Sequence, residues 1–285
     1  MSPPPLCLSG LGCWDSVEQG HRDLFGFLEL ARQLDLDGVD IYTRHFQSIE
    51  DDYLARVKQR CAQLELDIVC LAVDCDMSNP PHGRERQLAM AKQAVDAARL
   101  LGAPLVEVIA GWPMENESRE DAWHAVVEIL RDLCTHAQGT GVTVVLQNHN
   151  HDSLNRTADD ILRMIDDVGR DRIGHLLDTG QYIGSPGATG TTPETRSDDF
   201  YACIEKTAPL AQIVRAQTYH GGSREAGQKD DWQIDYDRVM RILKRAGFNG
   251  PICARHWGLE PEETGIPKGV DLLRQHLSRW DEYVP

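Results

Sequence analysis

Hydrophobic and polar residues recur along the chain with two periods, one typical of buried strands and the other of amphipathic helices. Short apolar runs such as DIVCLAV at residues 67–73 and VTVVLQ at 142–147 predict strands. The stretch RERQLAMAKQAVDAARLLG at 84–102 carries apolar residues at helical spacing and predicts a helix. Strands are expected at 6–11, 38–43, 67–73, 105–110, 142–147, 173–178, 213–219 and 251–257. Helices are expected at 21–34, 49–66, 84–102, 198–207, 236–247 and 267–280, and from 118 and 157 onward.

These elements form eight consecutive strand–helix units within 285 residues. Strands that alternate with helices return parallel to one another through right-handed crossovers, and eight such units close into a barrel. An open doubly wound sheet is the alternative, but no G-x-G-x-x-G motif follows the first strand. We therefore predict an α/β fold, a single (β/α)8 TIM barrel that occupies residues 1–285 as one domain.

Local signals mark several helix ends. Gly102 stands where a helix C-terminus needs a left-handed residue, and Ser118 with Asp121 resembles a capping box. Thr157 precedes two acidic residues that suit a helix N-terminus. The longest loops, 180–196 and 220–234, both follow strands, so the barrel places them on the face where active sites are built.

Polar and aromatic side chains gather where the predicted strands end. They are Trp14, Tyr42, Arg44, Asp74, Asp76, Trp112, Gln147, His149, His151, Asp178, Gln181, Gln217, Tyr219, His220, Arg255, His256 and Trp257. Because the strand ends of a barrel converge, these residues predict a small-molecule site for a hydroxyl-rich ligand, with the three Trp side chains as stacking faces. Glu107 lies within a strand, where a carboxylate needs a partner or a function.

Composition and charge narrow the classes of function. The net charge of −16 disfavours nucleic acids and anionic membranes as partners. The N-terminal residues do not resemble a secretory leader, and no apolar run approaches the length of a membrane span. The eight cysteines form no C-x-x-C pair, which favours reduced thiols and a cytoplasmic protein.

Several segments resemble one known family. They are LQNHNH at 146–151, LLDTGQYIGSPG at 176–187, VRAQTY at 214–219, IDYDRVMRIL at 234–243 and GFNGPI at 247–252. The family is the sugar phosphate isomerase/epimerase group with the xylose isomerase-like TIM barrel, which also includes endonuclease IV-type repair enzymes. The resemblance spans the whole chain and implies an isomerase or epimerase on that barrel.

The resemblance also implies a position for a divalent cation. Family members typically bind one cation through Glu, Asp, His and Glu on the fifth to eighth strands. The corresponding residues here are Gln147, Asp178, Gln217 and Arg255. A shifted register would instead place Tyr219 or His220 on the seventh strand and Trp257 on the eighth. Since only Asp178 remains a carboxylate, we expect no metal cofactor there. A displaced site for Mn, Mg, Co or Zn at His149 or His151, Asp178 and His220 is the alternative.

These substitutions favour acid–base chemistry without a metal. Arg255 brings a positive charge that Asp178 balances, and Gln147 and Gln217 add hydrogen-bond donors for an enolate oxygen. His149 shares strand parity with Gln147, so it is our first candidate for moving a proton, before His151, His220 and His256.

We therefore expect an isomerase or epimerase that transfers a proton next to the carbonyl of a sugar or polyol-like molecule. A metal-independent lyase, dehydratase or cyclase and a non-catalytic sugar-binding barrel are the alternatives. The expected catalytic residues are His149, Asp178, Arg255, Gln147 and His220. The expected substrate-binding residues are Trp14, Trp112, His151, Gln181, Gln217, Tyr219, His256, Trp257 and Glu107. A homo-oligomer is compatible with the sequence.

Overall fold

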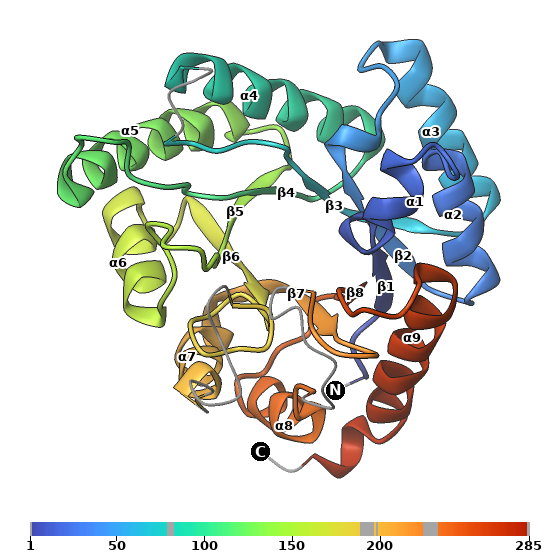
Figure 1. Cartoon of the computed structure of the whole chain (residues 1–285). Coiled ribbons are helices and arrows are strands. Elements are labelled where there is room, and N and C mark those ends of the chain that lie inside the picture. Colours follow the sequence, from blue (N-terminus) through green and yellow to red (C-terminus); the bar gives the residue numbers. More distant parts are fainter. Residues whose placement is uncertain (1, 79–82, 189–196, 198, 225–232, 284–285) are drawn as a thin grey trace.

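Eight parallel strands close into one barrel in the order of the chain, from β1 to β8 and back to β1 (Figure 1). The computed structural model describes residues 2–78, 83–188, 197, 199–224 and 233–283. The strands are β1 Leu6–Ser9, β2 Gly38–Tyr42, β3 Asp67–Ala72, β4 Leu105–Val108, β5 Thr143–Gln147, β6 Ile173–Asp178, β7 Ala211–Thr218 and β8 Ile252–His256. The predicted barrel fold is therefore confirmed.

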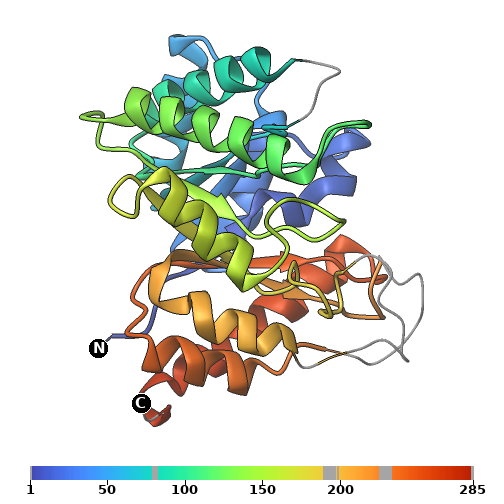
Figure 2. The ribbon, with the colours of Figure 1, turned by 90° about the vertical axis from the view of Figure 1, so that its left-hand side faces the viewer.

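Helices surround the barrel and cover its outer surface (Figures 1 and 2). The α-helices are α1 Trp14–Glu18, α2 Leu24–Gln33, α3 Asp51–Gln63, α4 Arg84–Leu101, α5 Arg119–Ala137, α6 Ala158–Val168, α7 Asp199–Thr207, α8 Tyr236–Arg245 and α9 Glu262–Ser278. Short 3-10 helices are Gly10–Cys13, Thr43–His45, Ala208–Leu210 and Trp280–Glu282. None of the described helices combines the length and the apolar character that a bilayer-spanning segment needs.

The local helix signals behave as their chemistry predicts. Gly102 ends α4 in the left-handed conformation, with φ 83°. The hydroxyl of Ser118 accepts from the amide of Asp121 at the start of α5. Thr157 and Asp160 form a reciprocal capping box on α6. Of the two long loops, residues 189–196 and 225–232 lie outside the described part of the chain.

The last helix begins earlier than the expected start at residue 267. Helix α9 starts at Glu262 and contains Pro267 in its second turn, where we had expected proline to begin the helix. The carboxylate of Glu262 accepts hydrogen bonds from the amides of Asp15 and Ser16, at 2.7 and 3.2 Å. This contact between distant parts of the chain holds the first turn of α9, and local sequence patterns carry no sign of it. The five-residue α1 was not predicted either, because it is too short for a periodic pattern.

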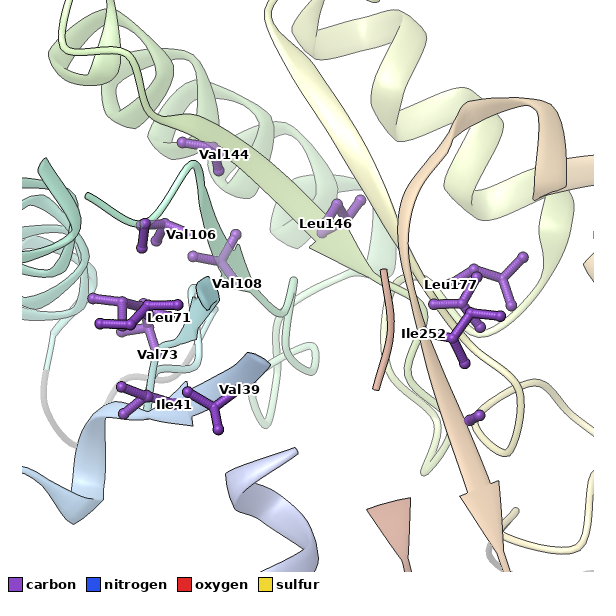
Figure 3. Close-up of a cluster of buried hydrophobic side chains, with 14 of the residues drawn as sticks. Val39, Ile41, Leu71, Val73, Val106, Val108, Val144, Leu146, Leu177 and Ile252 are labelled. Carbon is purple, nitrogen blue, oxygen red and sulfur yellow. The ribbon is translucent and has the colours of Figure 1, made fainter. Parts of the chain in front are cut away.

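The main hydrophobic core lies between the strands and the helices. Figure 3 labels several of its side chains, including Val106 and Val108 of β4 and Val144 and Leu146 of β5. Alternate residues of each strand point to this outer core, so the residues between them point into the barrel. All eight cysteines carry free thiols, and seven are buried.

The barrel interior changes from apolar to polar along the strands. Its apolar layer is a separate cluster formed by Cys7, Cys70, Leu105, Val145, Leu176, Ile213 and Cys253. Two residues further along the same strands are Ser9, Ala72, Glu107, Gln147, Asp178, Arg215 and Arg255. Because side chains two residues apart share a face of the strand, the polar layer lies directly above the apolar one, toward the carboxyl ends of the strands.

A buried arginine on β7 bonds residues of three other strands across this interior, and β1 joins them through Asp40. Arg215 donates from Nε and Nη2 to Asp40 Oδ2 on β2, at 3.1 and 2.7 Å. Its Nη1 donates to Gln147 Oε1 on β5 at 2.9 Å, and its Nη2 donates to Glu107 Oε2 on β4 at 3.4 Å. Ser9 on β1 donates to the same oxygen of Asp40 at 2.9 Å. We call these five residues the Arg215 cluster; all are buried, and the hydrogen bonds and opposite charges among them offset the cost of burying them.

We expect Asp40→Asn to lower the free energy of unfolding by about 3–5 kcal/mol, because Arg215 loses its closest counter-charge inside the barrel. Glu107→Gln is the matched control. Burial raises the pKa of Glu107 to about 7 against the opposing effect of Arg215, so the carboxyl is partly protonated at neutral pH. Replacing this carboxyl by an amide should lower the free energy of unfolding by about 1 kcal/mol or less. Denaturant titrations at pH 7 measure both changes, and equal losses would contradict the ranking of the two carboxylates.

His175 on β6 is a buried histidine whose neutral form the fold requires. Its Nδ1 lies 2.8 Å from the carbonyl oxygen of Leu146, and its Nε2 lies 3.3 Å from the hydroxyl of Tyr182. Burial lowers the pKa of His175 to about 4, although the Leu146 contact opposes this effect. The folded state therefore binds fewer protons than the unfolded state between about pH 4 and 6.5, and stability must fall as the pH falls through that window.

We expect His175→Gln to reduce the pH dependence of the unfolding free energy by up to about 1.4 kcal/mol per pH unit, the effect of one proton. Glutamine retains a donor for the Leu146 carbonyl. Urea titrations from pH 4.5 to 7 test this, with His124→Gln as the control because the His124 side chain is 70% exposed. An unchanged pH dependence in His175→Gln would refute the role assigned to His175.

Candidate active site

The carboxylate of Asp178, at the end of β6, is the most heavily bonded acid of the polar layer. Its Oδ1 accepts from Gln217 Nε2 at 2.7 Å and from the amide of Gly180 at 2.9 Å. Its Oδ2 accepts from Gln147 Nε2 at 3.1 Å, and Arg255 Nη1 lies 3.5 Å away. Gln147 therefore bonds Asp178 and also Arg215, and connects the Arg215 cluster to the strand ends. Burial raises the pKa of Asp178, although Arg255 and Arg215 oppose the rise.

Gly180 allows this arrangement by its lack of a side chain. A Cβ at this position would lie 2.0 Å from the hydroxyl oxygen of Tyr219 and 2.6 Å from the Gln217 amide. Tyr219 is fully buried and donates to Gln217 Oε1 at 2.6 Å. Gln217 is thus fixed at both ends of its amide, with its N–H group directed at Asp178.

Arg255 on β8 also belongs to the polar layer, and its guanidinium lies near the Asp178 carboxylate. Its side chain is 9% exposed, and its guanidinium carbon lies 4.5 Å from the centre of the Trp257 ring. A contact of this length is a cation–π interaction that holds the guanidinium in place. Arg224 lies on the same indole ring at 5.1 Å and forms an ion pair with Asp15 at 2.5 Å.

His149 follows β5 and lies among aromatic rings. Its imidazole is 5.3 Å from the Trp112 ring in an edge-to-face contact and 5.1 Å from the ring of His151. The chain turns sharply here because His151 and Asp152 adopt the left-handed conformation, with φ 57° and 62°. Such strained residues cluster at functional sites. Burial lowers the pKa of His149 to about 4, and the neighbouring His151 and the positive charges of Arg255 and Arg215 act in the same direction.

A second part of the barrel mouth lies at the ends of the first four strands. Trp14 stacks on Tyr42 with ring centres 5.7 Å apart, and Arg44 lies 5.2 Å from the Trp14 ring. Tyr42 donates to the carboxylate of Asp74. Next to Asp74 is a cavity of about 450 Å³ that Asp76, Trp112, Ile109, Cys75, Arg86, Gln87 and Met90 also line. The larger cavity of about 570 Å³ lies near the start of β5, at the opposite end of the strand from His149.

The remaining candidates have mainly supporting positions. Gln181 accepts from Asn150 Nδ2 at 2.8 Å and braces the loop that carries His149. His220 and His256 form a separate pair with ring centres 6.0 Å apart. His256 Nε2 lies 2.9 Å from the carbonyl oxygen of Glu260, and its ring packs against Gly265 of α9. The structure therefore does not bring this pair together with His149.

Two charged residues of the Arg215 cluster were missing from the expected site. Asp40 and Arg215 lie in the middle of apolar strands, in GVDIYT and IVRAQTY. A charged residue that alternates with apolar ones inside a barrel strand must point inward and needs a partner there. This is the signal that made Glu107 a candidate, and it applies equally to these two residues.

The residues at the family's cation position do not fit a divalent metal. Among them only Asp178 is a carboxylate, and both of its oxygens already accept hydrogen bonds from amide N–H groups. The amide oxygens of Gln147 and Gln217 accept from Arg215 and Tyr219, so they are directed away from Asp178. The guanidinium of Arg255 adds a positive charge 3.5 Å from the carboxylate. In the described part of the chain, no three His, Cys, Asp or Glu side chains are grouped as metal ligands.

Solved structures share this barrel. A D-tagatose 3-epimerase-like protein matches with a TM-score of 0.77, at 17% identity over 99% of this chain and 100% of that one. The 3-keto-D-glucoside 4-epimerase of E. coli matches with a TM-score of 0.73, at 14% identity over 95% and 99%. A xylose isomerase-like TIM barrel protein from Mycobacterium smegmatis, solved with magnesium, matches with a TM-score of 0.72, at 18% identity over 98% of both chains. At these identities the likeness establishes the fold alone.

Comparison with curated protein sequences finds no match. The sequence pattern of one family, described as xylose isomerase-like TIM barrel, matches residues 28–276, which is most of the chain. The closed order of the eight strands is the one that a TIM barrel has, in agreement with this match. The chain belongs to the xylose isomerase-like TIM barrel family.

Proposed function

We propose that this protein is an isomerase or epimerase that moves a proton next to the carbonyl group of a sugar or polyol-like molecule. The observation that carries the proposal is that an imidazole following β5 and a buried guanidinium near the end of β8 lie at the same mouth of the barrel. Trp112 packs against His149, and Trp257 packs against Arg255. The structural similarity to sugar epimerases supports this class of substrate.

His149 is the proposed proton carrier. Its Nδ1 lies 3.3 Å from the carbonyl oxygen of Asn150, a contact that assigns the ring proton to Nδ1 and leaves Nε2 as the acceptor. The lowered pKa keeps this acceptor free of a proton at neutral pH. Arg255 is the proposed source of positive charge in the site, because a fixed cation in a water-poor site stabilises a developing enolate.

The proposed reaction uses no divalent cation at the family position. The hydrogen bonds of Gln147, Gln217 and Asp178 support this assignment, since they consume the oxygens that a metal needs as ligands. These hydrogen bonds also hold the Asp178 carboxylate next to the Arg255 guanidinium. The carboxylate then acts as the counter-charge that positions the guanidinium.

The first test is exchange of substrate hydrogen with D2O, followed by NMR on ketoses such as D-tagatose and D-fructose. We expect His149→Ala to slow exchange about 10²–10⁴-fold, the usual contribution of a general base. In the intact protein the rate should stay level from pH 7 to 5 and fall only toward pH 4, because protonation of His149 removes the acceptor. The exposed His124→Ala on α5 should keep the intact rate.

Three outcomes would redirect the proposal. Exchange that persists in His149→Ala assigns the proton to another group. Exchange accompanied by a product lighter by one water or one CO2 identifies a lyase or dehydratase, and ligand binding without any exchange identifies a sugar-binding barrel.

The second test is exhaustive chelation. We expect EDTA treatment to leave the exchange rate unchanged, because the Arg255 charge takes the place of the cation. The double variant Gln147→Glu/Arg255→Glu is the matched control: it surrounds Asp178 with carboxylates and should gain measurable Mn²⁺ binding by calorimetry. Loss of activity with EDTA and rescue by Mn²⁺ or Co²⁺ would refute the metal-free mechanism.

A further inference from the structure

Arg255 has hydrogen-bonding capacity that the described residues do not use. None of them forms a hydrogen bond with its guanidinium, and the nearest carboxylate oxygen, Asp178 Oδ2, is 3.5 Å away. Its Nε is buried without a partner, and 9% of the side chain remains exposed. A buried cation without hydrogen bonds is costly, so the two terminal nitrogens form a receptor that a ligand can complete.

The other arginine of the barrel interior shows the contrast. Arg215 donates four hydrogen bonds to Asp40, Gln147 and Glu107, and its side chain is fully buried. Burial alone would lower its pKa, but the carboxylates of Asp40 and Glu107 outweigh burial and raise it. For Arg255 the burial effect exceeds the attraction of Asp178, and the pKa is lowered. One arginine is therefore fully compensated by the protein, and the other is not.

The open guanidinium is also held in a fixed orientation. The Trp257 ring lies against it at 4.5 Å, and the same ring carries Arg224 at 5.1 Å. Arg224 is held in turn by Asp15 and by the carbonyl oxygen of Gly258, to which its Nε donates at 2.9 Å. A preorganised receptor loses little entropy when a ligand binds, which favours a specific contact.

We propose that the terminal nitrogens of Arg255 bind a carboxylate of the substrate, so that the substrate is an acidic sugar of the uronate or keto-aldonate type. This inference rests on the proposed function, since it names the substrate class of that site. The planar carboxylate matches the paired N–H groups of a guanidinium, and it accepts the hydrogen bonds that Asp178, 3.5 Å from Nη1, does not.

Neutral and doubly charged groups fit this receptor less well. A hydroxyl or carbonyl oxygen provides an acceptor but leaves the positive charge without a counter-charge. A phosphate brings about two negative charges, and the closest ionisable neighbour of Arg255 is the Asp178 carboxylate, which repels it. Other cations of the barrel mouth have partners of their own, as Arg44 does in Glu18 and Arg224 in Asp15.

The test compares three ligands that differ only at C6: D-fructose, D-fructuronate and D-fructose 6-phosphate. Isothermal calorimetry on the intact protein should show D-fructuronate binding at least about tenfold tighter than the other two, the range of a charge-assisted hydrogen bond. Arg255→Met should remove this preference, and Arg255→Lys should retain part of it by keeping the charge without the fork. Arg156→Met, which removes an exposed charge paired with Asp152, should leave the preference intact.

Each outcome decides between the proposals. Tightest binding of the phosphate, equal binding of D-fructose and D-fructuronate, or a preference that survives Arg255→Met overturns the carboxylate receptor. If D-fructose exchanges hydrogen while D-fructuronate does not bind, the receptor fails and the proposed function stands. If D-fructuronate binds through Arg255 without exchange, the receptor stands and the proposed function fails. Thermal melting of both Arg255 variants confirms that they are folded when tested.

Discussion

The contact between Arg215 and Asp40 is the interaction on which the site depends. It crosses the barrel from β7 to β2 with two hydrogen bonds, and neither side chain is exposed. Gln147 joins this contact through one amide atom and reaches Asp178 with the other. The orientation of Asp178, and through it the environment of Arg255, is therefore set by a charge pair one layer deeper in the barrel.

This organisation separates the residues that hold the barrel together from those of the candidate site. The outer core and the apolar interior layer are formed by hydrophobic residues packed along the strands. The polar layer lies above the apolar interior layer, at the next inward position of each strand. In this layer the side-chain amides of Gln147 and Gln217 each form two hydrogen bonds. Their N–H groups donate to Asp178, and their oxygens accept from Arg215 and Tyr219.

Hydrophobic periodicity was sufficient to predict the barrel, since strand and helix patterns alternate over the whole chain. It failed where distant residues decide an element, as at α9, whose first turn depends on Asp15 and Ser16. The inward direction of Gln147 followed from strand alternation and agrees with its contact to Arg215. The partner of Glu107 could not be read from the sequence, because the pairing of inward residues across a barrel depends on the stagger of its strands.

The histidines of the site also show what residue type alone cannot predict. His149 and His256 both stand at strand ends, and residue type alone does not separate them. Alternation along β8 does, because Arg255 points inward and its neighbour His256 must therefore point toward α9.

The indole of Trp257 links the closure of the barrel to the position of Arg255. Arg224, from the segment after β7, lies on this ring and is tied to Asp15, near the start of the chain, while β1 pairs with β8. The first and last segments of the chain thus meet beside Arg255. Fraying of this seam requires only local opening, far short of global unfolding, yet it would release the indole that holds the guanidinium. The ligand affinity proposed for Arg255 should therefore fall when this seam between the first and last segments of the chain opens.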